Sequence, residues 1–331
     1  MPSLDPAIAE IRLAVRTALA DLPDGARVLV ALSGGADSLA LTAATVFEAR
    51  SRGMKVLSLT VDHGLQDGSD VIAAEAAVRA ERIGVDDALQ TKVAVRDAAG
   101  SGLEAAARDA RYAALRGIAG AEGAAAVLLG HTLDDQAETV LLGLARGSGA
   151  GSMQGMAPRR EDEDGTVWLR PMLGVRRTTT RAFCAASDLD VWHDPHNTES
   201  RFARVRVRES VLPVLEAELG PGIAEALART AEQLREDNAA FDEMIHETIE
   251  DIVEHAEAGI SVSVAALAAN PAALRNRIIR LVAHSEFGAS LTRTQTIEVA
   301  RLVTDWSGQG PIDLPGCSAA RVGGRIVLTA R

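Results

Sequence analysis

Apolar residues recur along the first half of the chain in two alternating patterns. Between residues 7 and 20, Ile8, Ile11, Val15 and Leu19 fall on one face of a helix. Short apolar runs of strand length then alternate with longer segments of helical periodicity. The runs that predict strands are 27–32, 55–61, 89–95 and 124–129, and the segments that predict helices are 38–50, 69–83, 103–118 and 132–146.

The alternation of strand and helix, with short loops between, predicts the fold class. Strands joined by crossover helices run parallel, so we expect an α/β domain built on a parallel sheet. Ligands of such sheets bind at the carboxyl ends of the strands. The segment 147–165, rich in glycine and charge, predicts a loop, and it is followed by a strand at 167–169 and a helix at 175–186.

The second half of the chain reads as mainly helical. A long apolar stripe from 223 to 252 has an acidic outer face, and helices are expected at 272–285 and 293–305. A hairpin is expected at 318–330, turning at Gly323-Gly324. Because a Gly-Pro-Gly hinge at 220–222 precedes the stripe, we expect one domain over residues 1–215 and a second, mainly helical one over 216–331.

The composition of the chain indicates its general class and its cellular compartment. Apolar residues make up 47% of its 331 residues, an ordinary globular share. Two cysteines, Cys184 and Cys317, form no disulfide framework and no Cys-x-x-Cys pair, which favours the cytoplasm. Asp5 and Glu10 stand where a signal peptide needs positive charge. The most apolar window, 28–47, carries a charge and a glycine pair, so no membrane partner is expected.

The net charge of −12 is unevenly distributed along the chain. Between 176 and 208 there are seven arginines against four acids, whereas 232–257 holds ten acids and one arginine. Net charge therefore does not exclude a nucleic acid partner, but it restricts where one could bind.

A glycine turn between the first strand and its helix is the first candidate site. Gly34 and Gly35 allow the backbone to turn sharply, and the N-terminus of the following helix presents free N–H groups and a partial positive charge. Hydroxyl donors flank them, so the turn predicts a pyrophosphate-like anion site. An acid beside a phosphate site is expected mainly where Mg²⁺ is present, so Asp37 predicts a contact with this ion. The alternative is a plain glycine turn with a serine N-cap. The whole segment is Ser33, Gly34, Gly35, Ala36, Asp37 and Ser38.

Ser-Gly-Gly-x-Asp-Ser after an opening strand resembles the PP-loop of the ATP pyrophosphatases, which cleave ATP between the α and β phosphates. Further motifs narrow the resemblance. Asp62-His63 ends the second strand, His131-x-x-Asp134-Asp135-x-x-Glu138 follows the fourth, and Asp194-Pro-His-Asn197 and an arginine run come later. In this order they resemble the tRNA(Ile)-lysidine synthetase family over residues 27–215.

This resemblance implies a PP-loop domain of the adenine nucleotide alpha hydrolase type, followed by a C-terminal tRNA-binding part. It also implies a reaction that uses ATP and Mg²⁺. The cytidine C2 oxygen of the wobble position in a CAU-anticodon tRNA(Ile) is adenylated, and free L-lysine then displaces AMP to form lysidine. A ligase of this kind changes tRNA identity from methionine to isoleucine. The oligomeric state stays open, with a homodimer as one option.

The residues around the third motif fit this chemistry. On a helix, His131, Asp135 and Glu138 share a face, and the two carboxylates could hold the cationic ends of lysine. Asp134 and Asp37 would then face Mg²⁺ and the phosphates. The alternative for Asp135 is structural, because Thr132-x-x-Asp135 is also a capping box.

Two pairs of residues are candidates for the nucleotide. Arg108 and Arg111, three apart on one helix, would stabilise charge at the α-phosphate. The alternative is a solvated helix face paired with acids. Asp62 and His63 lie where a strand ends and a nucleotide binds, although a hydrogen-bonded structural histidine is equally common.

Arg204, Arg206 and Arg208 alternate with apolar residues. If the segment is extended, all three share one face and could contact tRNA phosphates or the target base, and the alternative is a charged edge strand. The family more usually has asparagine where this chain has Val205, so a side-chain contact from that position is in doubt. Trp192 and His193 could stack on an unstacked base.

Three other functions compete with this interpretation. A PP-loop tRNA thiolase needs catalytic cysteines or an iron–sulfur cluster, and neither Cys184 nor Cys317 lies in a motif. A small-molecule amidotransferase-like synthetase would not explain the arginine run. A non-enzymatic nucleotide-sensing or RNA-binding module gains nothing from carboxylates near ATP.

Overall fold

The structure, a computed structural model, describes residues 4–64, 68–95, 102–147, 149–194, 199, 201–256 and 259–331. The chain forms two compact units, Met1–Arg235 and Glu236–Arg331, which divide inside helix α10 (Ile223–Ile252). The boundary at residue 215 remains a prediction from sequence. Residues 195–197 of the Asp-Pro-His-Asn motif lie outside the described residues. No helix in the described residues has both the length and the apolar character needed to cross a membrane.

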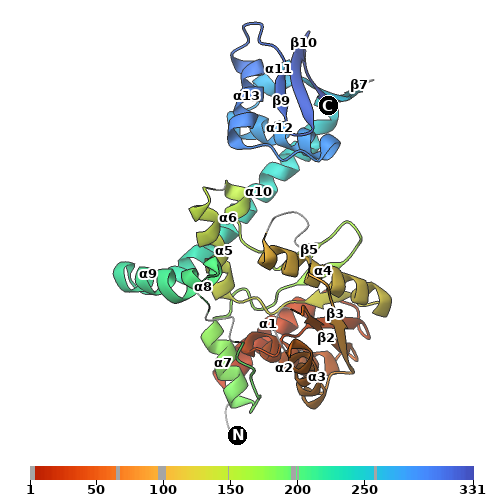
Figure 1. Ribbon diagram of the computed structural model, residues 1–331, viewed down its shortest axis with the longest axis vertical. Helices are drawn as coiled ribbons and strands as arrows, with labels where there is room; N and C mark the ends of the chain where they lie inside the picture. Colours follow the sequence, from red (N-terminus) through yellow and green to blue (C-terminus); the bar gives the residue numbers. More distant parts are fainter. Residues whose placement is uncertain are drawn as a thin grey trace. The chain divides into compact units, whose positions relative to one another are not determined.

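A six-stranded sheet forms the centre of the first unit (Figure 1). Its order is β3–β2–β1–β4–β6–β5, and every neighbouring pair is parallel except β5 with β6. The predicted α/β class is therefore confirmed. The segment predicted as a loop also contains a short helix, α6 (Ala150–Met153), and the edge strand β5. The strands are β1 (Arg27–Ala31), β2 (Lys55–Asp62), β3 (Asp87–Lys92), β4 (Ala126–Leu128), β5 (Arg159–Glu161) and β6 (Val167–Leu169).

Helices cover both faces of this sheet. They are α1 (Pro6–Leu19), α2 (Ala36–Arg50), α3 (Ser69–Ile83), α4 (Leu103–Glu122) and α7 (Arg177–Ala186). Because side chains alternate along a strand, Val28 and Val30 of β1 pack in a core with α1, α2, α3 and α7, whereas Leu29 packs in a core with Leu115 of α4. Figure 1 shows α3 and α4 on opposite sides of β2 and β3.

The arginine run forms helix, so the expectation of an extended segment is wrong. Residues 203–219 form α8 (Ala203–Arg206), a π-helical turn η2 (Val207–Val211) and α9 (Leu212–Leu219). Val207 and Leu212 pack with Leu133 of helix α5 (Leu133–Ala145) in one buried cluster, and this tertiary contact decides the conformation. In a helix, residues four apart share a face, which groups Arg204 with Arg208 and turns Arg206 away.

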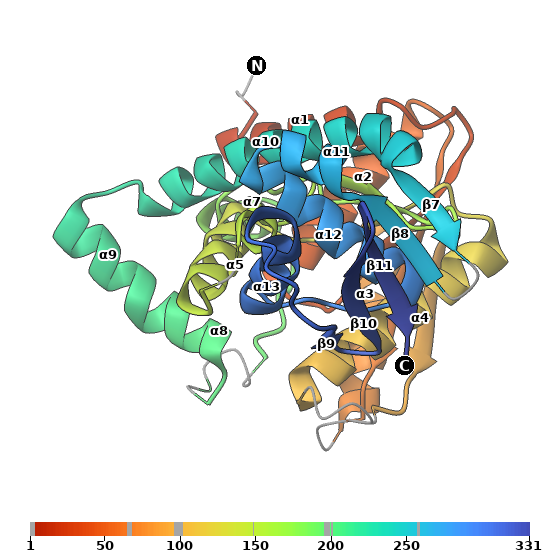
Figure 2. The same ribbon diagram turned by 90° about the horizontal axis from the view of Figure 1, so that it is seen from above.

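The second unit contains more strand than the sequence indicated. The predicted hairpin is confirmed, and the expected helices are present, but the unit also holds three further strands. Figure 2 shows them in one antiparallel sheet, ordered β7–β8–β11–β10–β9. Its elements are β7 (Val253–Ala256), β8 (Gly259–Ser263), α11 (Val264–Ala269), α12 (Ala272–Phe287), α13 (Arg293–Thr304), β9 (Ile312–Leu314), β10 (Cys317–Val322) and β11 (Arg325–Ala330).

A substitution at Gly259 tests the pairing of β8 with β11 in this sheet. A Cβ at this position would meet the carbonyl oxygen of Leu328 on β11 at 2.0 Å, and the φ of +156° is itself unfavourable for other residues. Gly259→Ala should therefore destabilise the unit by about 1–3 kcal/mol. Hydrogen–deuterium exchange of the β8 and β11 peptides measures the loss. Gly324→Ala, where an added Cβ meets nothing within 4 Å, is the matched control. Equal protection in both variants would refute the pairing of β8 with β11.

Candidate active site

The glycine turn has the local geometry that an anion site needs. Gly34 adopts φ +81°, and Gly35 is the N-cap of α2. The Ser38 hydroxyl donates to the Gly35 carbonyl at 2.9 Å and accepts from the Ser33 backbone N–H at 3.2 Å. The turn is therefore held in shape by its own serines, and the N-terminus of α2 faces the end of β1.

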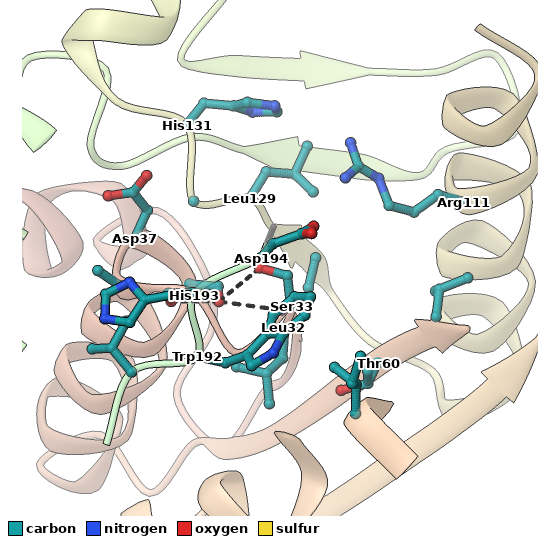
Figure 3. A pocket seen from close by; sticks show the side chains of 18 of the residues that line it. Leu32, Ser33, Asp37, Thr60, Arg111, Leu129, His131, Trp192, His193 and Asp194 are labelled. Carbon is teal, nitrogen blue, oxygen red and sulfur yellow. Dashed lines mark hydrogen bonds between the residues drawn. The ribbon is translucent and has the colours of Figure 1, made fainter. Parts of the chain in front are cut away.

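A cavity of about 1120 Å³ opens at this turn. It is lined by the glycine turn, the carboxyl ends of β2 and β4, and side chains from α4 and α7. This is larger than a typical small-ligand pocket of roughly 300–1,000 Å³. Figure 3 shows Asp37, His131 and Arg111 around it, each contributed by a different segment of the first unit. Trp192 and His193, the predicted stacking residues, also line the cavity.

Arg111 and Arg108 bring positive charge to the cavity from α4. The Nε of Arg111 is buried without a hydrogen-bond partner, and burial, together with Arg108 and Arg204, lowers the pKa of its guanidinium. Arg108 donates to the Tyr112 hydroxyl at 3.3 Å. Among the described residues, neither arginine forms an ion pair with a carboxylate. Arg108 is exposed, so the predicted alternative of a solvated helix face stays open for it, whereas the buried Nε of Arg111 favours a site for an added anion.

His131 is near these arginines but not on the helix. It precedes α5, so the predicted shared face with Asp135 and Glu138 is wrong for His131. Burial, with Arg170 and Arg111 nearby, lowers the pKa of His131 well below its usual range, and Asp135 opposes this shift only in part. The imidazole is therefore neutral at pH 7 and offers one donor and one acceptor.

Asp62 and His63 lie at the cavity wall where β2 ends. Asp62 accepts a hydrogen bond from the Gly64 backbone N–H at 2.8 Å and lies 3.7 Å from Lys92. Burial would raise the pKa of Asp62, but hydrogen bonds from Ser69 and Gly64, together with Lys92, lower it overall. Burial and Arg111 lower the pKa of His63. The structure therefore brings both residues to the place that the sequence predicted.

Acidic and basic side chains meet on one side of the cavity in what we call the acid–arginine cluster. Glu138, with no exposed surface, is its centre: Arg208 Nε lies 2.7 Å, Arg177 Nη1 3.2 Å and Arg204 Nε 3.3 Å from its carboxylate. Arg177 also pairs with Asp135 at 2.9 Å. A fully buried carboxylate requires such compensation. The cluster consists of Asp37, Asp134, Asp135, Glu138, Arg177, Arg204 and Arg208.

Asp135 has the structural role that the sequence offered as the alternative, and it also lines the cavity, while its contact with lysine stays a prediction. Its Oδ2 accepts from the backbone N–H and hydroxyl of Thr132, each at 2.8 Å, so the capping box is present. Its Oδ1 faces Arg177, and the residue lines the cavity. Burial would raise the pKa of Asp135, but Arg177, His131 and Thr132 lower it overall.

The two acids predicted to face the metal are placed differently. Asp37 lines the cavity and accepts from the Thr180 hydroxyl, and burial raises the pKa of Asp37 against that bond and Arg177. Asp134 instead accepts from the Arg177 backbone N–H at 2.7 Å and pairs with Arg176 at 3.3 Å. Its carboxylate thus caps α7 and is not among the residues that line the cavity.

The arginine run divides as its helical conformation requires. Arg204 and Arg208 line the cavity and reach Glu138, whereas Arg206 donates to the Arg201 carbonyl at 2.9 Å. The shared face predicted for all three arginines is therefore wrong, because the segment is not extended.

Arg177 and Thr180 at the start of α7 are site residues that the sequence analysis missed. Arg177 reaches Asp37, Asp135 and Glu138, and Thr180 donates to Asp37. One signal was available. Arg176 and Arg177 begin a predicted helix, where the helix dipole disfavours cations, so two arginines there imply acidic partners elsewhere.

The parallel sheet, the glycine turn and the cavity above it define a PP-loop domain. A family model described as a PP-loop domain matches residues 9–215, and a second, the TilS substrate binding domain, matches residues 263–327. The tRNA(Ile)-lysidine synthase of Leifsonia xyli is 57% identical over 308 residues, covering 93% of this chain and 91% of that protein. The chain belongs to the tRNA(Ile)-lysidine synthase family, and the predicted family is confirmed.

Other relatives agree with this assignment. The tRNA(Ile)-lysidine synthase of Streptomyces coelicolor is 47% identical over 352 residues and covers 98% of both chains. The U34-tRNA thiolase NcsA from Methanococcus maripaludis, solved with its [4Fe-4S] cluster, aligns with a TM-score of 0.57 over 70% of this chain and 80% of that one. At 19% identity this likeness supports the PP-loop fold alone.

Gly130 follows β4 and allows this part of the chain to lie close to the first turn of α2. A Cβ there would lie 3.3 Å from the backbone of Asp37 and Ser38. Gly130→Ala should displace the first turn of α2 and weaken ATP binding by about tenfold, which titration calorimetry measures. Gly120→Ala on α4 is the control, because an added Cβ meets nothing within 4 Å. Unchanged ATP affinity in the Gly130 variant would contradict this placement of the nucleotide.

Proposed function

We propose that this chain joins the ε-amine of free L-lysine to C2 of the wobble cytidine in a CAU-anticodon tRNA(Ile). Membership of the lysidine synthase family implies an enzyme that uses ATP and a tRNA. The observation that supports the site most directly is the cavity itself. It combines a glycine turn for a pyrophosphate with Arg111, whose buried Nε has no hydrogen-bond partner among the described residues and which lies across the cavity from Asp37 in Figure 3.

In the first step the cytidine O2 attacks the α-phosphate and pyrophosphate leaves. The N–H groups of the glycine turn and the N-terminus of α2 bind the departing pyrophosphate. Arg111 and Arg108, which line the cavity, stabilise the negative charge that develops at the α-phosphate, and the burial of the Arg111 guanidinium strengthens its effect.

In the second step the lysine amine attacks C2 and the oxygen leaves as part of AMP. Asp135 is the acid that would face the amine, because it lines the cavity. Glu138 is enclosed by three guanidinium groups and has no exposed surface, so we assign it to anchoring Arg204 and Arg208. This revises the predicted lysine contact of Glu138.

Mg²⁺ fits this cavity at one carboxylate. Asp37 lies beside the glycine turn with part of its carboxylate exposed. Magnesium commonly takes one or two carboxylates and completes its shell with phosphates and water. The described residues hold no group of three metal-binding side chains, which agrees with an ion brought in with ATP. When bound, the ion would neutralise charge on the phosphates. Asp134, engaged by Arg177, is left out of this proposal.

The C-terminal unit would bind the tRNA. Its matched domain is described as substrate binding, and residues 259–331 carry eight arginines against four acids. Arg280 and Arg293 have no ion-pair partner among the described residues, and burial and the neighbouring Arg277 lower the pKa of Arg280. Unpaired arginines suit RNA phosphates. A homodimer and a cytoplasmic location stay predictions.

The cysteines do not support the thiolase alternative. Cys184 is buried, donates to the Ala36 carbonyl at 3.4 Å, and burial with Asp37 nearby raises its pKa to about 12. The reactive form of cysteine is the thiolate. Cys317 is fully buried in β10 of the other unit.

The reaction is tested by incubating the chain with CAU-anticodon tRNA, labelled lysine and ATP, followed by nucleoside analysis. We expect lysidine only when all three are present. Arg111→Met should slow adenylation by about 100–1,000-fold while tRNA affinity stays within about twofold. The control is Arg116→Met. Arg116 lies on the same helix and pairs with Asp162, so its loss should leave the adenylation rate unchanged. Lysine incorporation at the wild-type rate in the Arg111 variant would exclude this role.

A further inference from the structure

The guanidinium group of Arg177 pairs with three of the four acids of the acid–arginine cluster. Arg177 Nε lies 3.5 Å from Asp37, Nη2 2.9 Å from Asp135 and Nη1 3.2 Å from Glu138. Its backbone N–H donates to Asp134 at 2.7 Å. Asp37 belongs to α2, and the other three acids belong to α5. A single residue of α7 therefore joins the helix of the phosphate turn to the helix that carries the predicted amine site.

The guanidinium of Arg177 and the carboxylates around it stabilise each other's charges in a mostly buried position. The side chain is only 14% exposed and stands at the N-terminus of α7, where the helix dipole opposes a positive charge. Burial would lower the pKa of Arg177, but Asp135, Glu138 and Asp37 raise it above its usual value. Removing one partner of such a buried set leaves the others uncompensated.

The other arginines of the cluster cannot take its place. Arg204 and Arg208 both pair with Glu138, and Arg208 reaches Asp135 at 3.7 Å. Among the described residues, Arg177 is the arginine that forms an ion pair with Asp37. The link between the glycine turn and α5 therefore runs through Arg177.

We propose that Arg177 is a positioning residue, which holds Asp37 beside the phosphates and Asp135 beside the amine in one fixed arrangement. The inference rests on the proposed function, because it concerns the geometry of the same two steps. A displacement of about 1 Å at a reacting group can cost roughly 100-fold in rate, so the loss of this one group affects both the adenylation and the amine attack.

The charged groups around Asp135 predict how the loss of Arg177 changes the pH dependence of activity. Asp135 faces Arg177 of α7, Arg208 of η2, and His131 and Thr132 of its own segment, while Asp37 faces Arg177, Thr180 and Asp135. An adjacent cation typically lowers a carboxyl pKa by about 1–3. Without Arg177, the pKa of Asp135 rises, and activity that needs its ionised form is lost at a higher pH.

The test compares Arg177→Gln and Arg177→Lys with Arg176→Gln. Arg176 is the neighbouring arginine, which pairs with Asp134 and Glu225 and forms no ion pair with the other acids of the cluster. We expect Arg177→Gln to reduce kcat for lysidine formation by about 100-fold and to move the acidic limb of the profile to higher pH. Arg177→Lys, which keeps the charge, should recover about tenfold of that loss. Arg176→Gln should match the wild type.

A purely structural role gives a different result. An equal loss in both Arg177 variants that does not change with pH, or wild-type kinetics in Arg177→Gln, would overturn the proposal. If Arg177→Gln does not fold, the pH profile of Arg177→Lys against Arg176→Gln decides.

A failure of the proposed function appears separately, as absence of lysidine with the wild-type chain. In that case the unfolding midpoints of Arg177→Gln, Glu138→Gln and the double variant still test the link. A double variant less destabilised than the sum of the two single variants supports it, and additive losses oppose it.

Discussion

A carboxylate that is removed from water must be neutralised where it lies, and Glu138 imposes this requirement on the first unit. Its two oxygens are matched by arginines from α7 and from the continuous segment α8–η2, so two segments distant from α5 in the sequence contact one point of that helix. The wall of the cavity follows from this convergence. Arg177 extends the same network to Asp37, and in this way the charge that stabilises the fold also orders the phosphate side of the site.

The architecture of the first unit could be predicted because its signals are local. Short apolar runs alternate with segments in which apolar residues recur about every 3.6 residues, and the strands β1, β2, β4 and β6 lie on those runs. The edge strand β5 was missed because its residues, Arg159, Arg160 and Glu161, form no apolar run. The strands β7, β8 and β9 were missed as well, and each is stabilised by pairing with a neighbouring strand in the sheet of the second unit.

The residues of the candidate site were likewise predictable where the sequence signal is local, and not where their contacts are distant in the chain. The glycine turn, Asp62, and the cavity position of Asp135 follow from motifs within a few residues of a strand end. Arg177 contacts acids more than 35 residues away in the chain, and the local pattern, two arginines at the start of a helix, implies acidic partners without identifying them. The arginine run was misread because alternation of arginine and valine over five residues fits a strand, whereas the burial of Val207 against Leu133 made it a helix.

The π-helical turn η2 has a consequence for how the arginines are held. The Leu212 N–H reaches back five residues to the Val207 carbonyl, and Pro213, which follows it, has no N–H to offer a regular α-helical ladder. The wide turn absorbs that interruption within a continuous helical path. The orientation of Arg208 in η2 relative to α9 thus depends on an uncharged imino acid, so a substitution at Pro213 would redirect a guanidinium without altering any ionisable group.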